Sequence, residues 1–340
     1  MKFGPVPIAQ AQGKILGHNI AGPNGRRLLR KGRALSGKDI QTLRDIGRKT
    51  VYVAELAPDD VGENEAARRV AAELGCGLRL VGPSAGRVNL LATGLGILRV
   101  DVERLYRINQ YEGITIATLQ NHTPVHQRQI VATVKIIPFA VPQNSVCHVE
   151  SIANSGNRAL ISIDMLTPKR VSMIFSGAVS IHEKLNRDFQ PLKQRIENLG
   201  SEITTTDYIP LEDESSEVTL AETLDRRRAA GAQLIVLAGE TAIMDRHDIV
   251  PRALERAGGR VECLGVPVDP GNLLMLGYLE GVPVLGAPGC ARSHKTNIVD
   301  WVLPRLLAGD HLTRADFIPL GHGGLLEDTP KRPMPRARVQ

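Results

Sequence analysis

The stretch 266–307 constrains the fold most strongly, because it joins two apolar runs to a glycine–proline bend and then to a helical pattern. The apolar runs 273–279 and 282–285 are separated by Glu280-Gly281, a pair that is typical of a β-hairpin turn. The second run ends in Gly286-Ala287-Pro288-Gly289, where glycine and proline permit a sharp turn and a close approach to a ligand. The sequence therefore predicts a hairpin whose second strand ends at a candidate binding loop.

A helix is expected directly after this bend, with Ser293 as its N-cap. A strand that ends in a bend and opens a helix directs backbone N–H groups and the positive end of the helix dipole toward one point, which favours an anionic ligand. Arg292, His294 and Lys295 add positive charge there. On spacing alone, a plain strand–loop–helix connection without a ligand is the alternative. The apolar side of the expected helix carries Ile298, Trp301, Val302, Leu303 and Leu306.

The composition argues against several classes of protein. Apolar residues make up 42% of the chain and aromatic residues only 3%, so a platform that stacks nucleic-acid bases is not expected. The four cysteines form no CxxC pair, which argues against a structural zinc site or a disulfide framework. No apolar run approaches the ~20 residues of a membrane span. We therefore expect a cytoplasmic protein with no nucleic-acid partner and no membrane partner.

From residue 171 onward, strand and helix patterns alternate, which is the signature of a parallel sheet covered by helices. The preceding region also carries an α/β pattern, although its periodicity is lost over 143–168. We predict an α/β protein with a mostly parallel sheet in its second half and an N-terminal α/β region. The expected divisions are an N-terminal segment 1–57, an α/β domain 58–168, the sheet domain 169–309 and a partly disordered tail 310–340.

Ligands of such sheets bind beyond the carboxyl ends of the parallel strands. Two carboxylates, Asp213 and Asp248, follow expected strands. Carboxylates beside a phosphate usually act through Mg²⁺, which prefers hard oxygen ligands. The alternative for Asp248 is a simple N-cap of the helix that follows it. The segments expected at this edge are Ser176-Gly177, Glu212-Asp213, 239–248 and 288–295.

Three segments of the second half carry a family resemblance. Pro270-Gly271-Asn272 and Gly286-Ala287-Pro288-Gly289-Cys290 resemble the two proline–glycine segments of molybdopterin-binding proteins in molybdenum-cofactor biosynthesis. Gly239-Glu240-Thr241-Ala242, with Asp248 downstream, resembles the Gly-Gly-Thr-Gly loop of the same family and its Arg-Asp pair. The residues around both proline–glycine segments are also similar to the domain that is fused to cofactor cytidylyltransferases.

The resemblance implies a three-layer α/β domain that binds molybdopterin or the molybdenum cofactor, as in molybdopterin molybdotransferase or adenylyltransferase. It further implies that Asp213 and Asp248 are catalytic residues and ligands of Mg²⁺, and that the segment after Pro288 holds the phosphate. The cofactor-binding residues implied by the resemblance are Ser176, Gly177, Gly239, Glu240, Thr241, Pro270, Gly271, Asn272, Pro288, Gly289, Cys290, Arg292, Ser293 and Lys295.

The chain departs from the catalytic members of this family at four places. Glu240 stands at a glycine position, Ala242 replaces a small polar residue or glycine, Asn272-Leu273 replaces a Lys-Pro pair, and Cys290 stands where asparagine is common. These changes add a negative charge and remove a cation, so binding of the cofactor is implied more directly than turnover.

Binding in late cofactor assembly would supply a cytidylyltransferase or an apo-molybdoenzyme, and the resemblance also implies a homo-oligomer. Three alternatives stay open. One is Mg²⁺/ATP-dependent transfer of an adenylyl group or of molybdenum, the second is a nucleotide pyrophosphatase-like enzyme of the same fold, and the third is a non-catalytic scaffold.

Overall fold

The computed structural model describes residues 1–211 and 213–326. Internal contacts divide the chain into two compact units, one made of 1–94 with 98–163 and one that contains 95–97 and resumes at Asp164. Within the described ranges, no helix has the length and apolarity that a membrane crossing requires. The part of the expected tail from position 327 onward lies outside the described residues.

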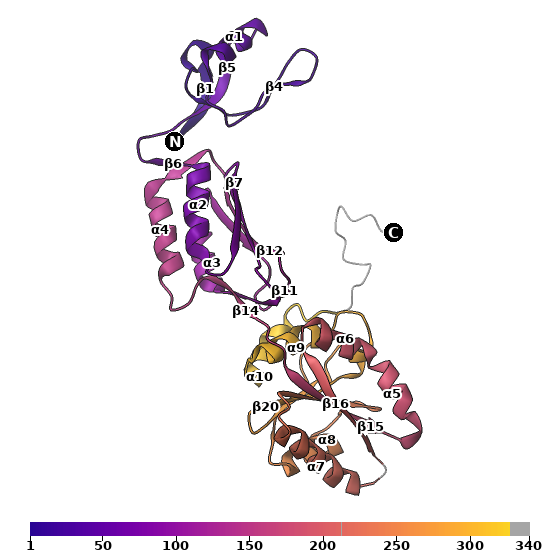
Figure 1. Ribbon diagram of the computed structural model, residues 1–340. Coiled ribbons are helices and arrows are strands. Elements are labelled where there is room, and N and C mark those ends of the chain that lie inside the picture. The colour runs from indigo at the N-terminus through magenta and orange to yellow at the C-terminus, as the bar shows by residue number, and fades with distance from the viewer. Residues whose placement is uncertain (212, 327–340) are drawn as a thin grey trace. The chain divides into compact units, whose positions relative to one another are not determined.

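The first unit begins with a small antiparallel sheet in the order β1-β5-β2 (Figure 1). Its alternating residues Val51 and Val53 face a core with Leu16 and Leu43, as expected for a strand with one buried face. β3 and β4 pair as a separate hairpin. The elements are β1 (Lys2–Pro7), β2 (Ile15–Leu16), β3 (Ile20–Ala21), β4 (Arg27–Leu29), α1 (Gly37–Asp45) and β5 (Thr50–Glu55).

The remainder of the first unit contains a four-stranded antiparallel sheet in the order β10-β12-β8-β7, and α2 packs against three of its strands and against α4. The loss of periodicity expected over 143–168 is wrong at its start, because α4 buries Val146, Val149 and Ala153 at the i, i+3 and i+7 spacing of a helix. The elements are β6 (Asp60–Gly62), α2 (Glu63–Leu74), β7 (Arg79–Ser84), β8 (Arg87–Leu91), β9 (Gly96–Val100), α3 (Val102–Ile108), β10 (Ile114–Thr118), β11 (Pro124–Val125), β12 (Ile130–Ile136), β13 (Ala140–Pro142), α4 (Gln143–Asn154) and β14 (Ile161–Met165).

The second unit is built on a six-stranded sheet in the order β16-β15-β17-β20-β19-β18. The strands β16, β15, β17 and β20 are parallel, and β19 is antiparallel to both of its neighbours. The prediction of an α/β fold with a mostly parallel sheet is confirmed. The strands are β15 (Arg170–Gly177), β16 (Glu202–Pro210), β17 (Leu234–Gly239), β18 (Arg260–Leu264), β19 (Met275–Leu279) and β20 (Val282–Gly286).

Helices cover both faces of this sheet and make three layers (Figure 1). On β17, Leu234, Val236 and Ala238 face one core and Ile235 and Leu237 face the other, because successive side chains of a strand point to opposite faces. The first core is covered by α5 (His182–Asp188), α6 (Gln190–Asn198), α9 (Val299–Ala308) and α10 (Arg314–Phe317), and the second by α7 (Ser215–Ala229) and α8 (Ile249–Arg256).

The predicted hairpin is confirmed, because β19 and β20 are antiparallel and Glu280-Gly281 turns between them with φ values of +47° and +83°. The predicted cap is wrong. α9 begins at Val299, six residues after Ser293, whose hydroxyl instead accepts a hydrogen bond from the N–H of Lys295 at 3.1 Å. The N-cap position of α9 is Ile298, and the buried side chain of Asn297, just before it, accepts from the N–H of Val299 at 3.0 Å.

Replacing Gly271 with alanine should destabilise the second unit by about 2–4 kcal/mol. Gly271 has a φ of +131°, and a methyl group there would lie 2.1 Å from Cγ2 of Ile298. The matched control is Gly289→Ala, since a methyl group at Gly289 meets no atom within 4 Å. Urea unfolding followed by the fluorescence of Trp301, the single tryptophan, compares the two variants. Equal midpoints would contradict this description of the bend.

Candidate functional site

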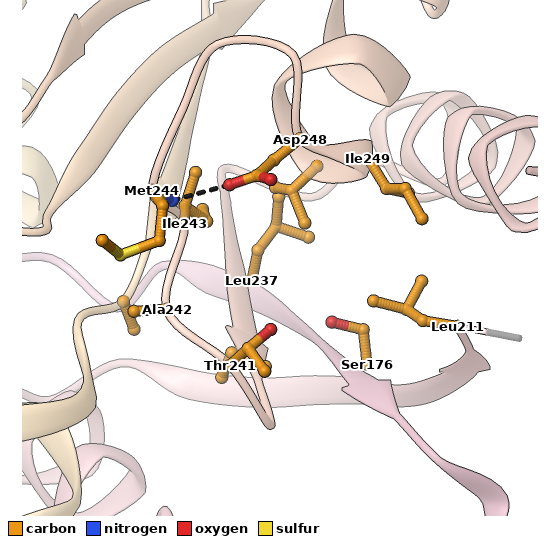
Figure 2. Close-up of a pocket in the computed structure, with 13 residues that line it drawn as sticks. Ser176, Leu211, Leu237, Thr241, Ala242, Ile243, Met244, Asp248 and Ile249 are labelled. Carbon is orange, nitrogen blue, oxygen red and sulfur yellow. Dashed lines mark hydrogen bonds between the residues drawn. The ribbon is translucent and has the colours of Figure 1, made fainter.

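A cavity of about 330 Å³ lies at the carboxyl ends of β15 and β17, on the side of the sheet that α7 and α8 cover. Figure 2 shows Ser176 and Thr241 at one end of it and Asp248 with Met244 at the other. Most of its walls are aliphatic. The lining residues are Ser176, Leu211, Leu237, Ala238, Gly239, Thr241, Ala242, Ile243, Met244, Asp248, Ile249, Val250 and Ala287.

The start of the loop after β17 lies tightly against the end of β15. The N–H of Glu240 donates to the carbonyl of Ser176 at 2.8 Å. A methyl group at Gly239 would lie 3.0 Å from the carbonyl oxygen of Thr241 and 3.2 Å from Oγ of Ser176. Glycine therefore suits this position, because the loop must turn close to the neighbouring strand.

The carboxylate of Asp248 closes the same loop. Its Oδ2 accepts hydrogen bonds from the N–H groups of Met244 at 2.6 Å and Asp245 at 3.0 Å, and Figure 2 shows the first of these. Asp248 does occupy the N-cap position of α8, but its side chain makes no capping hydrogen bond. The alternative expectation, that Asp248 simply caps the helix, is therefore correct in position but wrong in the hydrogen bond. The carboxylate instead holds the loop that forms the cavity wall, and we call this contact the clamp.

The side chain of Glu240 reaches the other loop of the edge. Its Oε2 accepts from the N–H of Ala178 at 3.0 Å. Burial, with the negative charge of Glu240 in addition, raises the pKa of Tyr208 above its usual value. The hydroxyl of Tyr208 donates to the carbonyl of Ala178. The molybdopterin-binding proteins that the sequence resembles have glycine at this position. In this chain the position holds Glu240, whose carboxylate accepts a backbone hydrogen bond from Ala178.

Arg292 braces this loop from the opposite face. One of its terminal nitrogens donates to the carbonyls of Gly239 at 2.7 Å and Glu240 at 3.0 Å. Its guanidinium lies 4.9 Å from the ring centre of Phe189, a distance typical of a cation–π contact. Its Nε is buried, with no hydrogen-bond partner among the described residues. Arg292 therefore positions the loop that forms the cavity wall.

The rest of the 288–295 segment is held mainly by backbone contacts. Residues Gly289–Arg292 form a short 3₁₀ turn, and Arg195 donates to the carbonyls of Ser293 and Lys295, each at 2.9 Å. Burial raises the pKa of the Cys290 thiol, so at neutral pH this side chain is a protonated thiol rather than a thiolate ligand. Pro288 is buried and Gly289 is exposed.

The other proline–glycine segment supports α9 rather than the cavity. The carbonyl of Pro270 accepts from the N–H of Ile298 at 3.3 Å, and Gly271 lies directly against the side chain of Ile298. The exposed residue Asn272 contributes its carbonyl to the N–H of Val266 at 2.9 Å. None of these three predicted cofactor contacts is among the residues that line the cavity.

Glu212 lies outside the described residues, and Asp213, just before α7, is fully exposed. The Oδ1 atom of Asp213 accepts hydrogen bonds from the N–H of Ser215 at 2.8 Å and from the Ser215 hydroxyl. Hydrogen bonds from Ser215 lower the pKa of Asp213 below its ordinary value. Over 1–211 and 213–326, no group of three or more histidine, cysteine, aspartate or glutamate side chains is arranged to hold a metal ion.

The structure therefore brings four of the predicted site residues together around the cavity: Ser176, Gly239, Thr241 and Asp248. Gly177, Glu240 and Arg292 lie behind this wall, where they contact it. Several apolar lining residues were not among the contacts predicted from the sequence. Each of them lies within two positions of a segment predicted at the edge, and that proximity was the available signal. They are Leu211, Leu237, Ala238, Ile249, Val250 and Ala287.

Comparison with known proteins gives one family match. The model of a domain of unknown function, DUF8806, matches residues 5–55. No curated protein matches the chain at a significant level.

Similar solved structures include the molybdopterin biosynthesis MoeA protein from Pyrococcus horikosii, with 13% identity, coverage of 91% of this chain and 75% of that one, and a TM-score of 0.29. A molybdenum cofactor biosynthesis protein from Pyrococcus furiosus has 11% identity and a TM-score of 0.24, over 91% of this chain and 64% of that one. Molybdenum cofactor biosynthesis protein B has 15% identity and a TM-score of 0.29, over 42% of this chain and 96% of that one. At such values, these likenesses assign neither a family nor an activity to the chain.

Asp248→Ala should loosen the wall of the cavity, because the N–H groups of Met244 and Asp245 lose their shared acceptor. We expect deuterium uptake in a peptide over 240–248 to become about tenfold faster, which corresponds to about 1.4 kcal/mol for lost hydrogen bonds. The control is Asp225→Ala on α7, which removes an exposed carboxylate paired with Arg228. Unchanged uptake over 240–248 in the Asp248 variant would show that the clamp does not hold the loop.

Proposed function

We propose that the second unit binds molybdopterin, in its free, nucleotide or molybdenum form, in the cavity at the carboxyl ends of β15 and β17. One observation carries the proposal. The loop 239–248, which bears the sequence resemblance to molybdopterin-binding proteins, forms a wall of the cavity. This position is also the one at which open α/β sheets bind their ligands.

The chemistry of the cavity supports a flat, partly polar ligand. Its volume of about 330 Å³ is at the lower end of the range for small-molecule sites, which begins at about 300 Å³. Aliphatic walls suit the faces of a bicyclic ring, and the hydroxyls of Ser176 and Thr241 suit its polar edge. In this proposal the ring enters the cavity, and the phosphate remains outside, toward the segment that contains Arg292, Ser293 and Lys295.

The geometry favours binding over transfer. Among the described residues, no group of three or more histidine, cysteine, aspartate or glutamate side chains is arranged to hold a metal ion. One oxygen of Asp248 already accepts two backbone hydrogen bonds, which gives this carboxylate a structural task in the absence of any reaction. Binding without turnover would suit a protein that hands its ligand to a cytidylyltransferase or an apo-molybdoenzyme.

Filling the cavity tests this proposal. Ala242→Arg places a long side chain in the wall and should weaken molybdopterin binding at least about tenfold, since the ring and the new side chain compete for the same space. Ala230→Arg, at an exposed position after α7, is the matched control and should bind like the wild type. Fluorescence titration under anaerobic conditions measures both affinities. Absence of saturable binding in the wild type, or equal affinity of the two variants, would reject the proposal.

The charge of Glu240 should act against a phosphorylated ligand. Glu240→Gln keeps an acceptor for the N–H of Ala178 and removes one negative charge from the edge. We expect affinity for molybdopterin to rise about fivefold, because a charge about 4 Å away in a water-like medium contributes about 1 kcal/mol. Glu222→Gln, an exposed change on α7, controls for net charge. Lower affinity in the Glu240 variant would mean that the carboxylate contacts the ligand favourably.

A further inference from the structure

Positive charge is concentrated in the small sheet at the start of the chain. Residues 1–55 contain eleven lysines and arginines and three aspartates and glutamates, a net charge of +8, whereas the whole chain carries +6. The excess thus belongs to this segment, and the rest of the chain is slightly acidic. The domain of unknown function matched by the chain covers nearly the same residues, 5–55. A surface of this kind attracts polyanions.

The β3–β4 hairpin presents the strongest part of this charge. Arg26, Arg27, Arg30 and Lys31 are all exposed. Within the part of the chain that the structure describes, none of the four has a carboxylate within 4.0 Å, whereas the nearby Arg33 is paired with Asp39 at 3.0 Å. Figure 1 shows the hairpin, labelled β4, standing away from the sheet formed by β1 and β5. Its cations are therefore available to an external partner.

An exposed aromatic group lies at the base of this hairpin. The ring of Phe3 is 5.7 Å from His18 and 5.9 Å from Tyr52, and His18 is 5.3 Å from Tyr52. Phe3 and Tyr52 remain 48% and 47% exposed, so their rings are accessible to a ligand. Gly17 makes the arrangement possible, because a methyl group there would lie 2.7 Å from the Phe3 ring.

The chain connects the two features directly. His18 precedes the first residue of β3 by two positions, and the side-chain oxygen of Asn19 accepts from the N–H of Lys31 at 2.9 Å, which ties both ends of the hairpin to its base. His18 of the aromatic group and the unpaired cations therefore lie on one continuous segment, 18–31, and Phe3 and Tyr52 lie beside its start. Single-stranded nucleic acid requires both, since cations bind its phosphates and rings stack on its bases.

We infer that this module, defined as the hairpin 20–31 with Phe3, His18 and Tyr52, binds single-stranded nucleic acid. The inference departs from the sequence-based expectation of no nucleic-acid partner. That expectation relied on the number of aromatic residues in the whole chain, whereas the structure gathers two of them with a histidine beside the hairpin. An acidic protein surface could bind the cations, but it has no bases to stack on the aromatic rings, so it would not use both features.

The test is fluorescence anisotropy with the nuclease-treated full-length protein and labelled mixed-sequence RNA and DNA strands of about 20 nucleotides. We expect saturable binding that weakens about 50-fold between about 50 and about 200 mM salt, as for four phosphate contacts. Arg26→Glu with Arg27→Glu should weaken binding at least about tenfold. Arg79→Glu with Arg87→Glu, two exposed positions in the same unit, makes the same charge change and should leave binding nearly unaltered.

Tyr52→Leu tests the contribution of the rings and should weaken binding at least about fivefold, within the range measured for base–aromatic stacking. Tyr106→Leu, an exposed tyrosine on α3 of the same unit, is its control and should have no effect. Three results would overturn the inference: no saturable binding at low salt, equal losses in the hairpin and control charge variants, or a Tyr52→Leu variant that binds like the wild type. The third result would indicate a surface that recognises charge alone, as an acidic protein would require.

Discussion

The parallel pairing of β17 with β20 is the constraint on which the candidate site depends. The register aligns Leu237 with Gly286, and the next residue, Ala287, donates its N–H to the carbonyl of Leu237 at 2.8 Å. This pairing places the loop after β17 beside the glycine–proline bend after β20. A loop and a bend that are some fifty residues apart in sequence thereby become neighbours at one edge of the sheet.

At that edge, the polar side chains are used mainly to hold loops in place. Glu240 joins the end of β17 to Ala178, Asp248 closes the loop on itself, and Arg292 braces two of its carbonyls. A wall held by several such contacts is ordered before a ligand arrives, which lowers the entropic cost of binding. The carboxylates of Glu240 and Asp248 thus hold backbone N–H groups of the loops, which is the physical basis of the proposed binding role.

Features that depend on the preferences of residues next to one another in sequence could be predicted, and features that depend on tertiary contacts could not. Glu280-Gly281 adopts positive φ values in a two-residue turn, a preference that is encoded in those residues. The alternation of strands and helices after residue 171 followed from apolar periodicity. The start of α9 did not, because the segment before the helix is held by tertiary contacts. Arg195 donates to the carboxylate of Asp300 and to the carbonyl of Ser293, about a hundred residues away in sequence. The partners of Glu240, Asp248 and Arg292 likewise depend on residues that only the folded chain brings near.

The most direct test of the central claim is the identity of the small molecule that copurifies with the full-length protein from a host that makes molybdopterin. The protein would be denatured, its ligand oxidised, and the product identified by mass and pterin fluorescence. The account predicts a phosphorylated pterin in an amount close to one per chain. Protein from such a host that carries no pterin, or that is saturated by a ligand of another chemical class, would contradict it.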